Sequence, residues 1–244
     1  MEEIKGALAI NNELNLYLVV NSVKPATMIS LSSLNSSLDT RVSKSEELRE
    51  KVRHVTLRMN SEVVDELRSY LEGTETEYKD WKQENVSESW DSQGNKTKHQ
   101  TCYDHMFYVG SNKECLERLL SAKSDREIGL ALGFPNESVE AYQKVIDGER
   151  RDGSYVSVSL ARAKQAGIEL PTWLAYICFV PENLDLVNGN ISPSSQILAE
   201  KYQNFVRKNN PDLARRVEQN FLDRKLPDSW EKTPDGGYSC CYKF

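Results

Sequence analysis

The sequence contains no long hydrophobic segment. Its longest uninterrupted apolar run is residues 173–180, whereas a membrane-spanning helix needs about 20 residues. The chain opens with Met1, Glu2 and Glu3, and this acidic start differs from the basic start of a secretory signal peptide. These features predict a soluble, cytoplasmic protein that has no membrane partner.

Cysteine pairs are also missing. The chain has five cysteines, an odd number, and no two of them are separated by two residues. Zinc ribbons use that spacing, and disulfide frameworks use an even number of cysteines. The cysteines therefore indicate neither a zinc ribbon nor a disulfide framework.

Short motifs of common enzymes do not occur in the sequence. It has no Gly-rich phosphate loop, no dinucleotide-binding fingerprint, no nucleophile elbow and no HExxH zinc motif. Histidine, the usual general base, occurs three times. An active site assembled from distant residues leaves no such motif, so whether the chain is an enzyme stays open.

The sequence is acidic, and its excess charge is concentrated in one segment. The formal net charge is −6, while residues 61–91 alone hold ten acidic and three basic side chains, a net charge of −7. Proteins that bind nucleic acid usually present a basic face to the phosphates. We therefore expect a protein or small-molecule partner, and the charge disfavours nucleic acid.

The 244 residues, of which 39% are hydrophobic, are enough for a packed core. Changes in composition divide the chain into three parts. We expect an N-terminal α/β segment over residues 1–73, an acidic and polar surface excursion over 74–101, and a helix-rich domain over 102–244. The predicted fold class is α+β and helix-rich, with short N-terminal strands packed against helices and a mainly α-helical C-terminal half.

Hydrophobic periodicity and capping boxes place the individual elements. Residues 13–20 fit a strand or a helix equally well, and the C-terminal tail from residue 236 fits a strand or a loose end. Strands are predicted at 54–59 and 103–109. Helices are predicted after the capping boxes that begin at Ser43, Ser111 and Ser124, over 63–71 with an end at Gly73, and over 135–147, 159–166, 193–208 and 211–226.

Residues 124–147 match the spacing of a helix-turn-helix. Gln143 and Lys144 would suit contacts with DNA, but Glu137 and Glu140 would face the phosphates. A packed helix pair with no role in nucleic-acid binding is the interpretation that we favour.

Residues 54–67 resemble the first half of a ribbon-helix-helix repressor. In such a repressor the strand would place Thr56 and Arg58 in the major groove. The expected second helix is replaced by the acidic segment after Gly73, so a strand–helix unit of a larger core is the favoured interpretation.

A metal site is a further hypothesis, with zinc as the metal. His99, Cys102 and His105 form an H-x-x-C-x-x-H pattern, and imidazole and thiolate both bind zinc. Cys240 and Cys241 in the tail could complete such a site. No fourth ligand lies nearby, so we favour an unrelated trio and predict no cofactor.

Residues 108–226 contain the segments YVGSNKECLERLL, SDREIGLALGFPNESVEAY, WLAYICFVPENL, NISPSSQILAEKYQNF and NNPDLARRV. In their order these segments resemble a prokaryotic, largely archaeal family defined as a domain of unknown function. Its clearest marks here are Leu132, Gly133, Phe134, Pro135 and Val139.

In that family a cysteine pair follows the turn, and a later Pro-Cys segment supplies another thiol. This chain has Glu137 and Ser138 at the positions of the pair, and Ser194 after Pro193. If the family's cysteines bind a metal, the resemblance implies that this chain has lost the ligands, because a serine hydroxyl is a poor substitute for a thiolate.

The sequence as a whole favours a non-enzymatic binding or interaction module. One alternative is a transcriptional regulator that binds DNA through the pair at 124–147. A second alternative is an enzyme or metal protein whose site cannot be recognised in the sequence.

Overall fold

The structure is a computed structural model of the whole chain. It describes residues 8–32, 61–90, 96–140, 143, 161, 164–165, 167, 173, 184–185, 190–191, 193–223, 226–232 and 238–241. Side chains between residues 83 and 103 are not described. The chain forms two compact units, Met1–Ser22 with Ala26–Leu120 and Val23–Pro25 with Ser121–Phe244.

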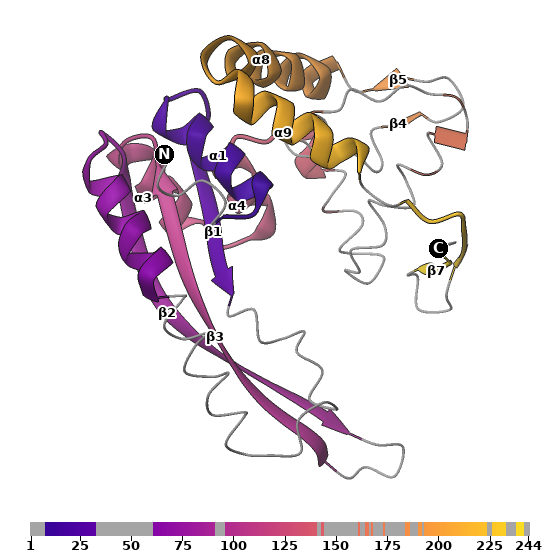
Figure 1. Cartoon of the computed structure of the whole chain (residues 1–244), viewed down its shortest axis with the longest axis horizontal. Helices are drawn as coiled ribbons and strands as arrows, with labels where there is room; N and C mark the ends of the chain where they lie inside the picture. The colour runs from indigo at the N-terminus through magenta and orange to yellow at the C-terminus, as the bar shows by residue number, and fades with distance from the viewer. Residues whose placement is uncertain are drawn as a thin grey trace. The chain divides into compact units, whose positions relative to one another are not determined.

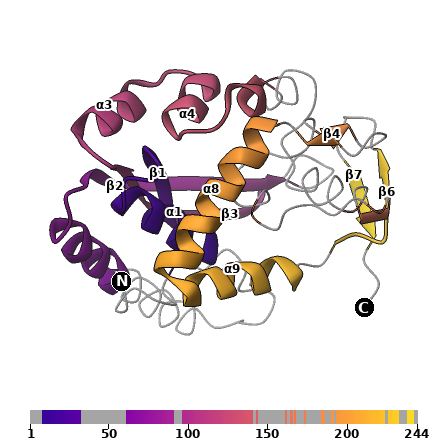
Figure 2. The same cartoon turned by 90° about the horizontal axis from the view of Figure 1, so that it is seen from above.

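Figure 1 labels most of the helices and strands of the two units, and Figure 2 also labels β6. The N-terminal unit contains α1 (Ile10–Val20), β1 (Ala26–Ser32), a helix over residues 61–72, β2 (Glu77–Trp90), β3 (Lys96–Gly110) and α3 (Lys113–Ser121), which ends at the unit boundary. The C-terminal unit contains α4 (Asp125–Ala131), a helical segment over 136–140, β4 (Leu184–Asp185), β5 (Asn190–Ile191), α8 (Pro193–Asn209), α9 (Pro211–Leu222), β6 (Ser229–Lys232) and β7 (Tyr238–Cys241).

The N-terminal unit contains a three-stranded antiparallel sheet in the order β1-β3-β2. β1 pairs with β3 from Ala26↔Gly110 to Ser32↔Asp104. Beyond that last pair β2 and β3 continue as a two-stranded hairpin, which Figure 1 shows extending past the end of β1. We call residues 84–90 and 96–103 the hairpin arm.

The strands β2 and β3 cover most of residues 74–101, the segment in which the sequence predicted a polar surface excursion and indicated no strand. Alternation of polar and apolar residues marks a strand only where one of its faces is buried. The hairpin arm lies beyond the end of β1, and its pairing depends on backbone hydrogen bonds that any residue except proline can form. The sequence therefore carries little pattern there.

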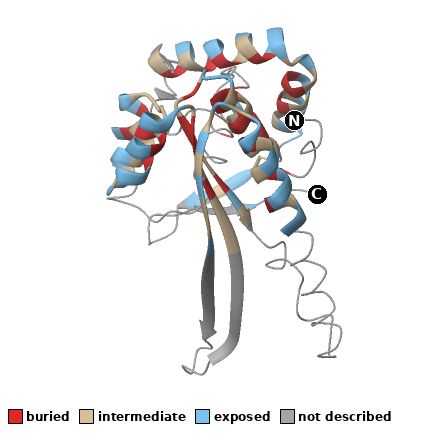
Figure 3. Cartoon of the chain, turned by 90° about the vertical axis from the view of Figure 1, so that its left-hand side faces the viewer, coloured by how far each residue is buried: buried red, intermediate tan, exposed pale blue. Residues whose placement is uncertain are grey.

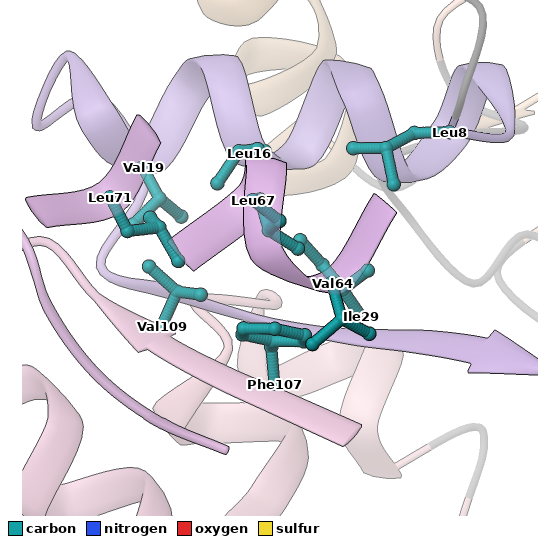
Figure 4. Close-up of a cluster of buried hydrophobic side chains, with 9 residues drawn as sticks. All are labelled: Leu8, Leu16, Val19, Ile29, Val64, Leu67, Leu71, Phe107 and Val109. Atoms are coloured by element: carbon teal, nitrogen blue, oxygen red, sulfur yellow. The ribbon is translucent and has the colours of Figure 1, made fainter. Parts of the chain in front are cut away.

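One hydrophobic cluster joins two helices to the sheet (Figure 4). Figure 3 shows buried residues in red on the described part of the sheet. The spacing of the buried residues in the helix over 61–72 is the one predicted from the sequence. The cluster contains Leu8, Leu16, Val19, Ile29, Val64, Leu67, Leu71, Phe107 and Val109.

Residues 13–20, which fit a strand or a helix, belong to helix α1. Leu14, Leu16, Leu18 and Val19 are all buried, and in a strand Val19 would lie on the face opposite the three leucines. Packing of Leu16 and Val19 in the hydrophobic cluster favours the helix, because only the helix brings both side chains to the sheet.

The capping residue of α3 is Asn112 and not the predicted Ser111. The Asn112 side-chain oxygen accepts a hydrogen bond from the Cys115 backbone N–H at 2.9 Å. An asparagine and a serine cap equally well, so two adjacent candidates cannot be separated by sequence alone. The predicted cap of α4 is confirmed, since Ser124 accepts a hydrogen bond from the Glu127 N–H at 3.2 Å.

The turn after α4 brings two short helical segments close together. Gly133 has a φ of +82°, a conformation that favours glycine. A Cβ atom at Gly129 would lie 2.9 Å from Cγ2 of Val139, so only glycine allows this approach. The predicted turn at Gly133 and the predicted helix start after Pro135 are therefore confirmed.

The predicted helices at 193–208 and 211–226 correspond to α8 and α9, which follow one another at a steep angle (Figure 2). The tail forms β7, which pairs with β6. Together with the sheet and helices of the N-terminal unit, these elements confirm the α+β, helix-rich class. The predicted elements at 43–53 and 54–59, and most of 159–166, lie outside the described residues.

Candidate functional site

A row of polar contacts joins the helix over residues 61–72 to the root of the hairpin. We call it the polar seam. Its helix residues lie three and four positions apart and so share one side of the helix. The seam consists of Asp65, Arg68 and Glu72 on the helix, Tyr78 and Asp80 on β2, and His105 on β3.

Asp80 is the centre of the polar seam, and a single carboxylate oxygen receives all of its hydrogen bonds. Arg68 donates to Oδ2 of Asp80 through Nη2 at 2.6 Å and through Nε at 3.1 Å. Nε2 of His105 lies 2.5 Å from the same oxygen. Asp80 thereby ties one helix and two strands together.

The contacts of His105 define which ring nitrogen carries the proton. Oδ2 of Asp80 can only accept, so Nε2 of His105 donates to it. Nη2 of Arg68 lies 3.5 Å from Nε2 and is itself a donor, so it offers no alternative acceptor. Among the residues that the structure describes, no hydrogen bond to Nδ1 is found.

The charges of the polar seam stabilise one another. Burial by itself would raise the pKa of Asp80, but hydrogen bonds from Arg68 and His105 outweigh it, and the pKa lies below the ordinary 3.8. The hydrogen bond to Asp80 raises the pKa of Arg68. Arg68 also donates to Asp65 through Nη1 at 3.1 Å, so its guanidinium is committed to two carboxylates.

The other end of the polar seam is a weaker contact. The Tyr78 hydroxyl donates to Oε1 of Glu72 at 3.3 Å. Burial, followed by the charge of Glu72, raises the pKa of Tyr78. Tyr78 and Asp80 therefore both hold β2 against the same helix.

Acidic side chains predominate around the start of β2. Glu66, Glu75 and Glu77 are exposed, and no hydrogen bond or ion pair to another described residue is found for them. Lys79 is exposed as well. The surface of this part of the chain is thus negative even after Arg68 is counted.

The outer edge of β2 is the second feature of this region. β2 has 14 residues and is the last strand of the sheet order β1-β3-β2. Within the described ranges no other strand pairs with it on the side away from β3. The polar seam and this edge form the candidate functional site of the N-terminal unit.

The predicted metal ligands do not converge. His99, Cys102 and His105 lie three residues apart along β3, opposite Glu88, Asn85 and Lys82. Six residues of extended strand separate the backbones of His99 and His105 by about 20 Å, whereas two histidines on one zinc each lie about 2 Å from it.

The tail cysteines belong to β7, in the C-terminal unit. Cys240 lies opposite Trp230, and Cys241 is a free, exposed cysteine. A search of the described residues found no group of three His, Cys, Asp or Glu side chains that could hold a metal.

The N-terminal turn of the supposed recognition helix is engaged within the C-terminal unit. Ser194 of α8 donates to Oε2 of Glu137 at 2.6 Å. Asn136 donates to Glu140 at 2.8 Å and accepts from Arg126 at 3.2 Å.

The other residues predicted to contact DNA give little support to a role in DNA binding. Gln143 is half-buried, while Lys144, Thr56 and Arg58 lie outside the described residues.

The positions at which the chain departs from the resembled family pattern lie side by side. Besides the Glu137–Ser194 contact, the hydroxyls of Ser138 and Ser195 are 2.9 Å apart and buried. Fifty-seven residues separate the partners of each pair. The pairs join the helical segment over 136–140 to the start of α8.

Sequence reasoning missed Arg68 and Asp80. Both lie in the acidic segment, where isolated charged residues are typical of a solvated surface. Only the pairing of Asp80 with Phe107 and of Lys82 with His105 in the hairpin brings Asp80 near the histidine, and no local pattern encodes that pairing.

Comparisons of the chain with family models, curated proteins and solved structures found no match. No helix in the described part of the chain is long and apolar enough to cross a membrane.

Proposed function

We propose that the chain is a non-enzymatic binding module that contacts a partner through the β2–β3 hairpin. The observation that carries this proposal is the 14-residue strand β2, whose outer edge is unpaired within the described residues. An unpaired edge offers a row of backbone donors and acceptors to another chain. Binding of an extended segment at such an edge is a common mode of peptide recognition.

The hairpin arm supports the same proposal. A two-stranded hairpin is marginally stable in water without a third strand or a packed face. β1 ends opposite Asp104, and among the described residues no other strand takes its place beside the arm. A partner that pairs with the arm would provide the missing contacts.

The alternatives receive less support from the geometry. For DNA binding, the hydrogen bond from Ser194 engages Glu137, and the remaining exposed face carries the carboxylate of Glu140. For catalysis, His105 is hydrogen-bonded to Asp80, but no described hydroxyl or thiol is hydrogen-bonded to His105. The archaeal family resemblance and the cytoplasmic location stay predictions.

A shortened hairpin tests the proposed function. Glu84 lies opposite Tyr103, so replacing residues 85–102 by Asn-Gly closes the strands with a two-residue turn and leaves the polar seam intact. Tagged full chain and shortened chain are used to purify partners from cells of the source. A stoichiometric partner bound by the full chain alone is expected.

The control replaces only residues 91–95 by glycine and serine and keeps both strands. It should retain the partner. Equal recovery of the same proteins by the shortened chain, or no partner with either chain, would contradict the proposal.

A further inference from the structure

We propose that the segment received by the outer edge of β2 is an extended stretch rich in lysine or arginine, which adds to the sheet as a fourth strand beside β2. This inference deepens the proposed function and rests on it. The charges beside the edge indicate which kind of partner segment would bind there.

Charge complementarity is the first argument. Glu75 and Glu77 are exposed at the start of β2, and Glu72 of the polar seam is exposed on the helix over residues 61–72. Arg68 is committed to Asp80 and Asp65, and Lys79 and Lys82 are exposed on this part of the strand. A cationic segment therefore gains attraction along the edge, and an anionic one meets repulsion.

The same charges argue against a second copy of the chain as the occupant. Two β2 edges related by two-fold symmetry would bring equivalent surfaces together. Both copies would carry the same excess of negative charge, −7 over residues 61–91, and like-charged surfaces repel one another on association. A partner of opposite charge has no such penalty.

The polar seam also prepares the edge for binding. Tyr78 and Asp80 lie two residues apart on β2, so they share one face of the strand. Both are hydrogen-bonded to the helix over residues 61–72. Phe107, which lies opposite Asp80, belongs to the hydrophobic cluster. The root of β2 is thus fixed before a partner arrives, which lowers the entropic cost of pairing.

The test uses synthetic peptides and the full chain. Alternating (Lys-Val)4 and (Glu-Val)4 peptides are titrated while the backbone amide signals are followed by NMR. We expect the lysine peptide to bind at least about tenfold more tightly at low salt and to weaken as salt is added, with the largest shifts along β2, within residues 77–90.

Two controls separate strand addition from nonspecific attraction. A lysine peptide with alternate N-methyl groups keeps its charge but loses donors for the strand ladder, and it should bind less tightly. Glu77→Lys should reduce the preference for the lysine peptide, whereas Glu231→Lys, at an exposed site on β6, should leave it unchanged.

The possible failures are distinct. If the glutamate peptide shifts the β2 amides as strongly as the lysine peptide, the charge inference is wrong while strand binding at this edge stands. If neither peptide shifts them, or if N-methylation has no effect, the strand-addition inference is wrong. The purification with the shortened hairpin then decides the proposed function separately.

Discussion

Each unit of the protein has a carboxylate that collects several hydrogen bonds on one oxygen. In the N-terminal unit Oδ2 of Asp80 receives Arg68 and His105. In the C-terminal unit Oε1 of Glu218 receives the Trp173 indole N–H at 3.2 Å and Arg207 at 2.9 Å. These bonds lower the pKa of both carboxylates despite the opposing effect of burial.

The two centres differ in what they hold. Trp173 is fully buried, so Glu218 anchors an aromatic side chain within the C-terminal unit. The amide of Gln203, turned by 180°, would accept from Trp173 at 3.2 Å and from Arg207 at 3.0 Å.

Asp80 has no comparable substitute among the described residues, and it lies on an edge strand. The Glu218 centre thus anchors a buried side chain, whereas the Asp80 centre fixes the position of the edge strand to which the proposed function assigns binding.

The largest expected effect concerns the aromatic side chain held by Glu218. Trp173→Ala should lower the free energy of unfolding by about 3–5 kcal/mol, because it leaves a large cavity in a packed interior. Urea denaturation followed by circular dichroism measures the loss. Trp173→Phe retains the ring and should cost much less. A loss under about 1 kcal/mol for the alanine variant would show that Trp173 does not organise this unit.

The next largest effect compares the two carboxylates directly. Asp80→Asn should cost about 2 kcal/mol, the scale of hydrogen bonds to charged groups. Glu218→Gln should cost about 1 kcal/mol or less, because Gln203 can replace the lost acceptor. Urea denaturation of both variants measures the difference. Equal losses would remove the distinction between the centres.

Hydrogen exchange locates the effect of the same substitution at Asp80. In Asp80→Asn the amides of residues 77–82 should exchange faster, because β2 loses its bond to the helix. The corresponding amides should be unaffected in Glu218→Gln. Unchanged exchange along β2 in Asp80→Asn would mean that the polar seam does not fix the edge.

Acid should weaken both centres. A carboxylate whose pKa is lower in the folded state binds fewer protons there than in the unfolded chain, so it stabilises the fold above the unfolded pKa. That contribution disappears as the pH falls through the folded pKa, below the ordinary 3.8 for Asp80 and 4.5 for Glu218. Stability measured between pH 6 and 2 should depend less on pH in Asp80→Asn than in the unaltered chain.

The smallest effect distinguishes two adjacent residues at the start of α3. Asn112→Ala should cost about 1 kcal/mol through the lost cap, and Ser111→Ala should change the free energy of unfolding little. Ser124→Ala, at the cap of α4 in the other unit, is the matched comparison and should also cost about 1 kcal/mol. Thermal denaturation of the three variants ranks them, and a larger loss for Ser111→Ala than for Asn112→Ala would restore Ser111 as the cap.

Local features were predictable where neighbouring residues decide them. The cap at Ser124, the turn at Gly133 and the helix at 63–71 follow from side chains within a few positions of one another, and the structure confirms them. The choice between Ser111 and Asn112 shows the limit of such reasoning, since both residues can cap a helix and differ by one position.

The sequence by itself determined the α+β, helix-rich class, the helices with a clear apolar period and the acidic character of residues 61–91. Only the tertiary structure decided that residues 13–20 form a helix, because contacts of Leu16 and Val19 with a distant sheet favour it. It also decided that a polar, aperiodic stretch forms a long hairpin and that Arg68, Asp80 and His105 meet. The reason is physical: strand pairing joins residues far apart in the chain through backbone bonds, and these bonds are nearly independent of side-chain identity.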